Sequence, residues 1–211
     1  MPPRPRTAFE IPIEQAVVSL GIAQSWEFAG YLETPLGPLI EIRTLMRQDG
    51  ADPSQSVIDA AAGNKLVVHH NHLSQESLSV PDWNGLATLF DEAFAHSADG
   101  KTYWGRVVDH QTVVRLIRTS PLCEDQNILF SILLAANVND PTGLAFFFRK
   151  EVFNRAMKLR GFVEYEYTWG TQNVTPLGRP VSSPAYPPAG IAGVQIDHFI
   201  DQAAAAMAPQ L

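Results

Sequence analysis

The chain has 211 residues, of which 45% are hydrophobic and 18% are charged. This composition is typical of a folded globular protein and excludes an intrinsically disordered chain. The net charge of -7 argues against a broad nucleic-acid-binding surface, because phosphate binding needs clustered Lys and Arg side chains. A single cysteine, Cys123, excludes a disulfide framework within the chain, so the fold must depend on its hydrophobic core.

Two features of the sequence predict a soluble, cytoplasmic protein that does not bind a membrane. The N-terminal residues lack the apolar segment of a secretory signal. No apolar run reaches the roughly 18 residues that a membrane-spanning helix needs, and the closest, at 128–138, is typical of a buried helix. Secretion by a route without a cleaved signal stays open, and so does the oligomeric state.

Hydrophobic periodicity and turn residues divide the first half of the chain into strands and helices. The predicted elements are, in order, a helix over 13–23, two strands over 27–33 and 39–46 that form a β-hairpin, a helix over 53–62 with Asp52 as its cap, a strand over 65–70, a helix from 79 to about 96, and a strand over 101–109. This order predicts an α/β fold in which helices flank one mixed β-sheet.

The second half of the chain is predicted to be a mostly helical extension. Helices are expected over 110–118, 127–137, 142–160 and 196–207, with a strand over 163–169 and a Pro-rich linker over 175–190. We expect the basic end of the helix over 142–160, from Arg149 to Arg160, to be a solvated face. The predicted regions are a lead (1–12), an α/β domain (13–109), a helical region with one strand (110–174), and a Pro-rich linker with a terminal helix (175–211).

Residue types that bind metals are concentrated between residues 69 and 82, which read HHNHLSQESLSVPD. His70 and His72 are spaced i and i+2 at the end of a predicted strand, so both side chains point to the same face. Asp82 lies in the first turn of the next helix, which the loop between them can fold back over the strand end. Two imidazoles and a carboxylate leave one position open for water, which is the ligand set of a catalytic zinc ion. Such an ion favours hydrolysis by activating the water, and a carboxylate base is needed to take up its proton.

Ser79, which precedes Asp82 by one helical turn, has two interpretations. Ser79-Val80-Pro81-Asp82 has the spacing of a helix N-terminus in which Ser79 is the cap. The Ser79 hydroxyl could also donate to the oxyanion that forms when a carbonyl group is attacked. Both roles are compatible with a ligand role for Asp82, because a carboxylate in a first helical turn can face a strand end.

This combination of H-N-H, a short polar loop and S-x-x-D resembles the motif of the JAB/MPN metalloproteases, also called JAMM proteases. It is most similar to the RadC-type branch and to the branches in phage and polymorphic-toxin proteins. The resemblance covers roughly 15–109 and implies a cytidine-deaminase-like α/β fold. It implies zinc ligands at His70, His72 and Asp82, with Ser79 as oxyanion support. It also implies a protein or peptide substrate, cleaved at a peptide bond or at an isopeptide bond such as that of a ubiquitin-like modifier.

The resemblance further implies a general base, since the family carries a Glu on an early strand upstream of the histidines. Glu27 matches this position best, and Glu33 and Glu41 are rival candidates. The chain departs from the family pattern at two points. Leu73 stands where the family usually has Pro, and His69 is an additional histidine whose side chain is expected to face the opposite side of the strand.

Two other functions compete with a hydrolase. A non-catalytic JAB-like scaffold that binds a protein partner is disfavoured by the complete ligand set. An HNH-type nuclease is suggested by the letters alone, but those enzymes do not carry their residues in one tripeptide, and the acidic charge disfavours DNA binding. The other histidines, His96, His110 and His198, are expected on the surface, and Tyr103 and Trp104 in the core or in the wall of a substrate groove.

Overall fold

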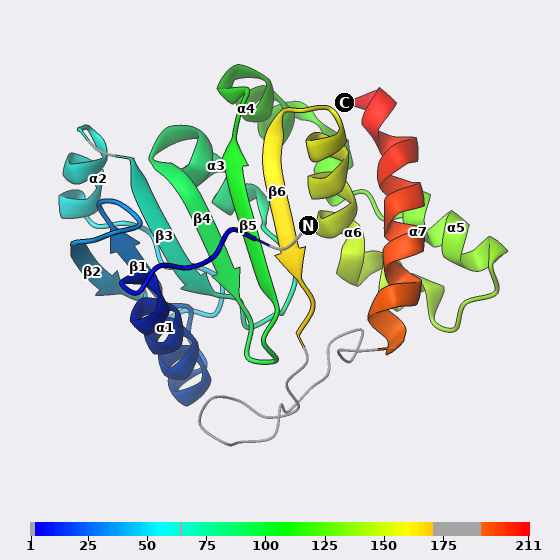
Figure 1. Ribbon diagram of the computed structural model, residues 1–211. Coiled ribbons are helices and arrows are strands. Elements are labelled where there is room, and N and C mark those ends of the chain that lie inside the picture. Colours follow the sequence, from blue (N-terminus) through cyan, green and yellow to red (C-terminus); the bar gives the residue numbers. More distant parts are fainter. Residues whose placement is uncertain (1–2, 64, 171–190) are drawn as a thin grey trace.

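The computed structural model describes residues 3–63, 65–170 and 191–211, and one mixed β-sheet forms its centre (Figure 1). The strands are β1 (Ala29–Leu32), β2 (Leu39–Arg43), β3 (Leu66–Asn71), β4 (Phe90–His96), β5 (Thr102–Val107) and β6 (Val163–Thr168). They lie in the order β2-β1-β3-β4-β5-β6. β3 and β4 are parallel, whereas the other neighbouring strands are antiparallel. The predicted α/β class with a mixed sheet and flanking helices is confirmed.

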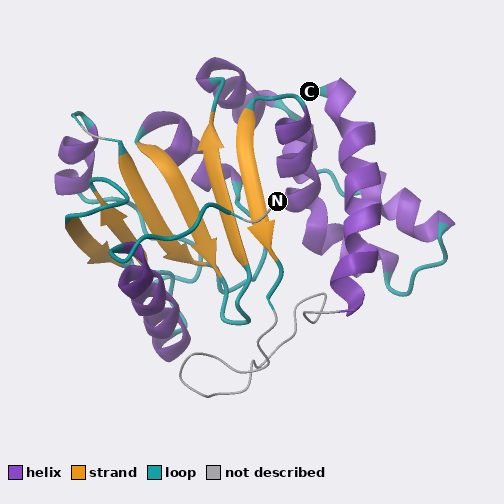
Figure 2. Cartoon of the chain, viewed as in Figure 1, coloured by secondary structure: helices purple, strands orange, loops and turns teal. Residues whose placement is uncertain are grey.

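Helices cover both faces of this sheet and extend beyond β6 (Figure 2). The described α-helices are α1 (Glu10–Gln24), α2 (Gln55–Ala61), α3 (Val80–Thr88), α4 (His110–Thr119), α5 (Asn127–Ala135), α6 (Pro141–Leu159) and α7 (Ile191–Met207). α1 packs against β1 and β3, while α3 packs against β4 and β5 from the opposite face. α5, α6 and α7 pack on one another, and α6 also contacts β6. No described helix is both long and apolar enough to span a bilayer.

Alternation along the first strand separates two groups of buried side chains. Phe28 and Leu32 belong to the apolar group beneath α1. Ala29 and Tyr31 belong to the larger core on the other face of the sheet. The predicted hairpin is confirmed, since β1 and β2 pair antiparallel. Because side chains alternate between the two faces of a strand, only every second residue of β1 faces α3.

The prediction of one helix from 79 to about 96 was wrong in its second half. The helix α3 ends at Thr88, and the chain then enters β4, which pairs with β3 on one side and β5 on the other. Phe94 and Ala95 are fully buried between these neighbours. Pairing along both edges outweighs the local helix propensity of this segment. The cap of α2 also differs from the prediction, because the Ser54 side chain, not that of Asp52, accepts the hydrogen bond from the Val57 amide.

The described part of the second half shares one core with the sheet. Its helices lie within two residues of the ranges predicted over 110–118, 127–137 and 142–160. β6 pairs with β5 and so completes the same sheet. Arg155, predicted to lie on a solvated face, is buried and pairs with Glu151 at 2.8 Å. The linker predicted over 175–190 lies outside the described residues, and α7 begins before the predicted 196.

Candidate metal centre

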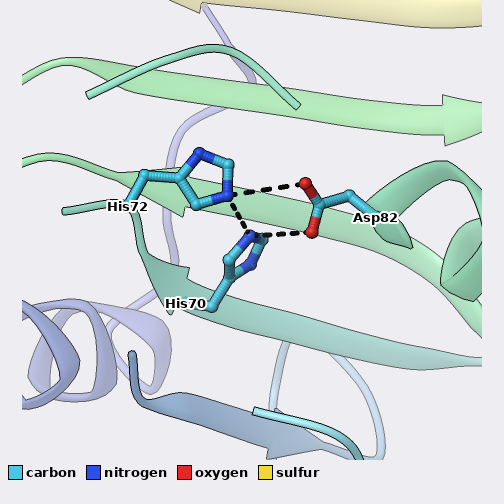
Figure 3. Close-up of side chains that lie close together, drawn as sticks. All are labelled: His70, His72 and Asp82. Carbon is cyan, nitrogen blue, oxygen red and sulfur yellow. Dashed lines mark hydrogen bonds and ion pairs between the residues drawn. The ribbon is translucent and has the colours of Figure 1, made fainter. Parts of the chain in front are cut away.

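Three predicted ligands meet where β3 ends and α3 begins (Figure 3). His70 lies opposite Ala29 of β1, and His72 follows two residues later on the same face. Nε2 of His70 is 2.9 Å from Nε2 of His72 and 3.0 Å from Oδ1 of Asp82. Nε2 of His72 is 3.4 Å from Oδ2 of Asp82. The strand period and the first turn of α3 therefore place two imidazoles and a carboxylate around one point.

The donor atoms of this group fit a cation. Nδ1 of His72 lies 2.8 Å from the backbone carbonyl of Glu76, and because a carbonyl can only accept, Nδ1 carries the proton. The Nε2 atom of His72 then offers its lone pair toward His70 and Asp82. Zinc bonds of ~2.0–2.1 Å in tetrahedral geometry separate neighbouring ligand atoms by about 3.3 Å, close to the separations found here. His70, His72 and Asp82 could hold a metal ion.

The same three residues also interact electrostatically with one another. Burial alone would lower the pKa of His72, but its hydrogen bond to Asp82 and the charge of that carboxylate outweigh burial and raise the pKa to about 9. Burial alone would raise the pKa of Asp82, but the imidazoles of His70 and His72 hold it well below its ordinary value. The Asp82 carboxylate therefore favours a positive charge at this position, which is either a proton on His72 or a cation that displaces this proton.

Ser79 caps the helix that carries Asp82. Its side chain accepts a hydrogen bond from the Asp82 amide, and the Asp82 carboxylate accepts one from the Ser79 amide at 2.6 Å. This reciprocal capping box confirms the predicted helix start. The Ser79 hydroxyl also donates to Oδ2 of Asp82 at 2.6 Å. Ser79 therefore fixes the orientation of a candidate ligand, and its role as oxyanion support stays a prediction.

Glu27 lies in the same cavity as the three candidate ligands. The cavity has a volume of about 320 Å³, and its lining includes Glu27, His70, His72, Ser79 and Asp82. Glu27 precedes Ala29 by two residues, so it shares the face of β1 that looks toward α3. Burial raises the pKa of the Glu27 carboxyl, although the neighbouring imidazoles act in the opposite direction.

The rival carboxylates are placed differently. Glu41 lies on β2 and accepts a hydrogen bond from the Ser54 amide at 3.4 Å. Glu33 follows the end of β1, where its amide donates to the carbonyl of Pro38 in the hairpin turn. Neither residue is among those that line the cavity. Of the three candidates, Glu27 alone lines the cavity that holds His70, His72 and Asp82.

The sequence did not indicate that the segment after β2 forms part of the cavity wall. Arg47, Asp49, Asp52 and Pro53 line this cavity. The chain reaches this position because the amide of Glu27 donates to the carbonyl of Arg47 at 2.7 Å. The residues at 47–53 are typical of a turn, but their sequence does not show that this turn would lie against the cavity.

The additional histidine faces away from the metal centre, as predicted. Nε2 of His69 donates to the Glu10 carboxylate at 3.2 Å, which leaves Nδ1 to accept from Nε2 of His96 at 3.0 Å. His96 was predicted on the surface, but it is fully enclosed because β4 is an interior strand. Its Nδ1 lies 3.3 Å from the Thr102 hydroxyl, so every nitrogen of the pair has a partner.

The remaining aromatic and histidine predictions are mostly confirmed. His110 and His198 are exposed. Tyr103 and Trp104 are buried in the sheet, which fits the core interpretation.

The chain was also compared with known proteins. No protein-family model, curated protein or solved structure matches it. The resemblance to the JAB/MPN family therefore remains a prediction from the motif between residues 69 and 82, and the grouping of His70, His72 and Asp82 is the feature from which a function must be inferred.

Proposed function

We propose that this protein is a zinc-dependent hydrolase of the JAB type that cleaves a peptide or isopeptide bond. The observation that carries the proposal is the meeting of two imidazoles and a carboxylate in one cavity that is also lined by the half-buried Glu27. The order of strand, polar loop and capped helix around these residues is also the order that the JAB resemblance implies.

Zinc is the proposed ion because the site offers two nitrogens and one oxygen, a set that leaves one coordination position free for chemistry. When bound, zinc would act as a Lewis acid toward the scissile carbonyl and make water more acidic. Two contacts within the chain fix the orientation of the candidate ligand atoms. The Glu76 carbonyl fixes the tautomer of His72, and the Ser79 hydroxyl fixes the carboxylate of Asp82.

Glu27 is the proposed general base. It would accept a proton from the attacking water and deliver it to the leaving amine, which needs a carboxyl group that can both bind and release a proton. Burial raises the pKa of the Glu27 carboxyl above its ordinary value, which favours the uptake of a proton. Ser79 is the proposed donor to the developing oxyanion, a role that requires its hydroxyl to turn from Asp82 toward the substrate.

Metal analysis and a cleavage assay test the proposal together. The purified protein should contain about one zinc ion per chain, and His72→Ala should lose it. Glu27→Gln should keep the zinc and lose hydrolysis of peptides and of conjugates of ubiquitin-like modifiers. A protein that takes up no zinc at neutral pH would refute the proposal.

The same measurements distinguish the competing functions. Zinc binding without hydrolysis of any such substrate would favour a non-catalytic scaffold. Nicking of plasmid DNA in the presence of magnesium or zinc, abolished by His72→Ala, would favour a nuclease.

A further inference from the structure

The loop between β3 and α3 is held in place by α6 from the second half of the chain. The carboxylate of Glu76 pairs with Arg149 and Lys150 of α6, each at 2.7 Å. The backbone carbonyl of the same Glu76 accepts the hydrogen bond from Nδ1 of His72. The residue that orients one candidate ligand is therefore anchored to a helix more than seventy positions away in the sequence.

A second anchor on α6 is Asn154, whose side chain is completely buried. Its amide nitrogen donates to the Ser77 hydroxyl at 2.8 Å and to the Leu78 carbonyl at 2.9 Å. Its amide oxygen accepts from Nε1 of Trp83 at 2.7 Å. These partners lie on both sides of Asp82 in the sequence. One side chain thus binds the segment before the helix start and the first turn of α3 at the same time.

The polar contacts of Asn154 continue into a buried chain of hydrogen bonds. Because the only hydroxyl proton of Tyr165 is donated to Glu151, the Ser77 hydroxyl, which accepts from Asn154, donates to the Tyr165 hydroxyl at 2.6 Å. The Tyr165 hydroxyl in turn donates to the carboxylate of Glu151, which also pairs with Arg155. Ser77, Tyr165 and Glu151 are each at most 2% exposed. Buried networks of this kind are rigid when complete and costly when one member is missing.

We propose that Asn154 is a positioning residue of the metal centre, which holds residues 77–83 so that Asp82 faces His70 and His72. The inference rests on the proposed function, because it assigns these three residues as ligands. Partners that orient metal ligands without touching the ion typically change metal affinity by ~10–100-fold when they are removed. The helical second half is then an obligatory part of the metal centre and not an appendage to it.

The test compares Asn154→Ala with Met157→Ala in the full chain. Met157 is an equally buried, apolar residue of the same helix, so its variant measures the effect of lost packing alone. Zinc affinity is measured by competition with a chromophoric chelator, and amide hydrogen exchange of residues 72–83 is measured in the metal-free protein. Asn154→Ala should weaken zinc binding by ~10–100-fold and accelerate exchange in this segment by about tenfold or more, and Met157→Ala should do neither.

Either of two results would overturn the inference. One is a variant Asn154→Ala that stays within about twofold of the wild type in both measurements. The other is an equal loss of zinc affinity in Met157→Ala, which would show a general effect of stability. If the wild-type protein binds no zinc, the proposed function fails, and the exchange comparison alone then decides whether Asn154 orders the segment.

A milder pair of variants covers the case in which Asn154→Ala does not fold. Ser77→Ala removes the hydroxyl between Asn154 and Tyr165. Ser97→Ala is its matched control, because Ser97 is equally buried and its hydroxyl has no hydrogen-bond partner in the described part of the chain. Ser77→Ala should accelerate exchange of residues 72–83, and Ser97→Ala should not. Equal exchange in the two variants would contradict the inference.

Discussion

The affinity for zinc should depend steeply on pH, and the contact between His72 and Asp82 indicates how steeply. The pKa of His72 is raised from 6.5 to about 9 by its contact with Asp82. At neutral pH an incoming ion must therefore displace one proton from His72. Displacing one proton strengthens the apparent affinity by about tenfold per pH unit, up to the pKa of His72. Between pH 7 and pH 9 the gain should approach about a hundredfold.

The stability of the metal-free protein should change with pH in the opposite direction. The folded-state pKa of His72 lies above its ordinary value, so the stabilising contact with Asp82 is fully present below pH 6.5 and is lost as the pH rises through about 9. A shift of this size corresponds to about 3 kcal/mol. Asp82→Asn should abolish most of this dependence, because it removes the charge that holds the proton.

Two assays measure the opposite pH dependences of zinc affinity and of protein stability. Competition with a chelator of known pH dependence gives zinc affinity at pH 6.5, 7.5 and 8.5, and urea unfolding in the presence of a strong chelator gives the stability of the metal-free protein. Titration in buffers of different ionisation enthalpy counts the protons that zinc releases. A zinc affinity that does not vary with pH, or release of no proton at neutral pH, would refute the pairing of His72 with Asp82.

Three further predictions follow from the site and the fold. Glu27→Gln should retain zinc and reduce hydrolysis by ~100–10,000-fold; cleavage rates within a few-fold of the wild type would remove Glu27 from the mechanism. Ser79→Ala should lower the free energy of unfolding by about 1 kcal/mol in urea and weaken zinc binding, whereas the cap variant Ser54→Ala on α2 should affect stability alone. Glu10→Gln should destabilise the protein at neutral pH and flatten its acid unfolding curve. Hydrogen bonds from His69 and Arg4 outweigh burial and depress the pKa of Glu10, so its contribution is present above pH 4.5 and is lost as the pH falls; an unchanged acid curve would contradict this assignment.

Local patterns in the sequence were sufficient to predict the elements that carry the candidate ligands. The spacing of His70 and His72 on a Val-rich strand, and the capping sequence from Ser79 to Asp82, depend on neighbours within a few residues. Both were found where the pattern placed them. The opposite orientation of His69 followed from the same strand period.

Features that depend on distant partners could not be predicted in this way. The segment Phe90–His96 has helix-forming residues, and only pairing with β3 and β5 makes it a strand and buries His96. Asn154 lies more than seventy residues from the loop that it holds. No local periodicity marks such a contact, so the contribution of the second half to the site emerged from the fold alone.

The alternation along β3 makes this strand intolerant of a shift in pairing. The imidazoles of His69 and His70 lie in two separate environments on opposite sides of the sheet. A slip of the pairing register by one residue would turn His70 toward Glu10 and present His69 and Asn71 to the cavity. The cavity would then lose His70 as a candidate cation ligand, and Glu10 would lose its contact with His69 at the same time. Small insertions or deletions within this strand should therefore be far more damaging than any single substitution in it.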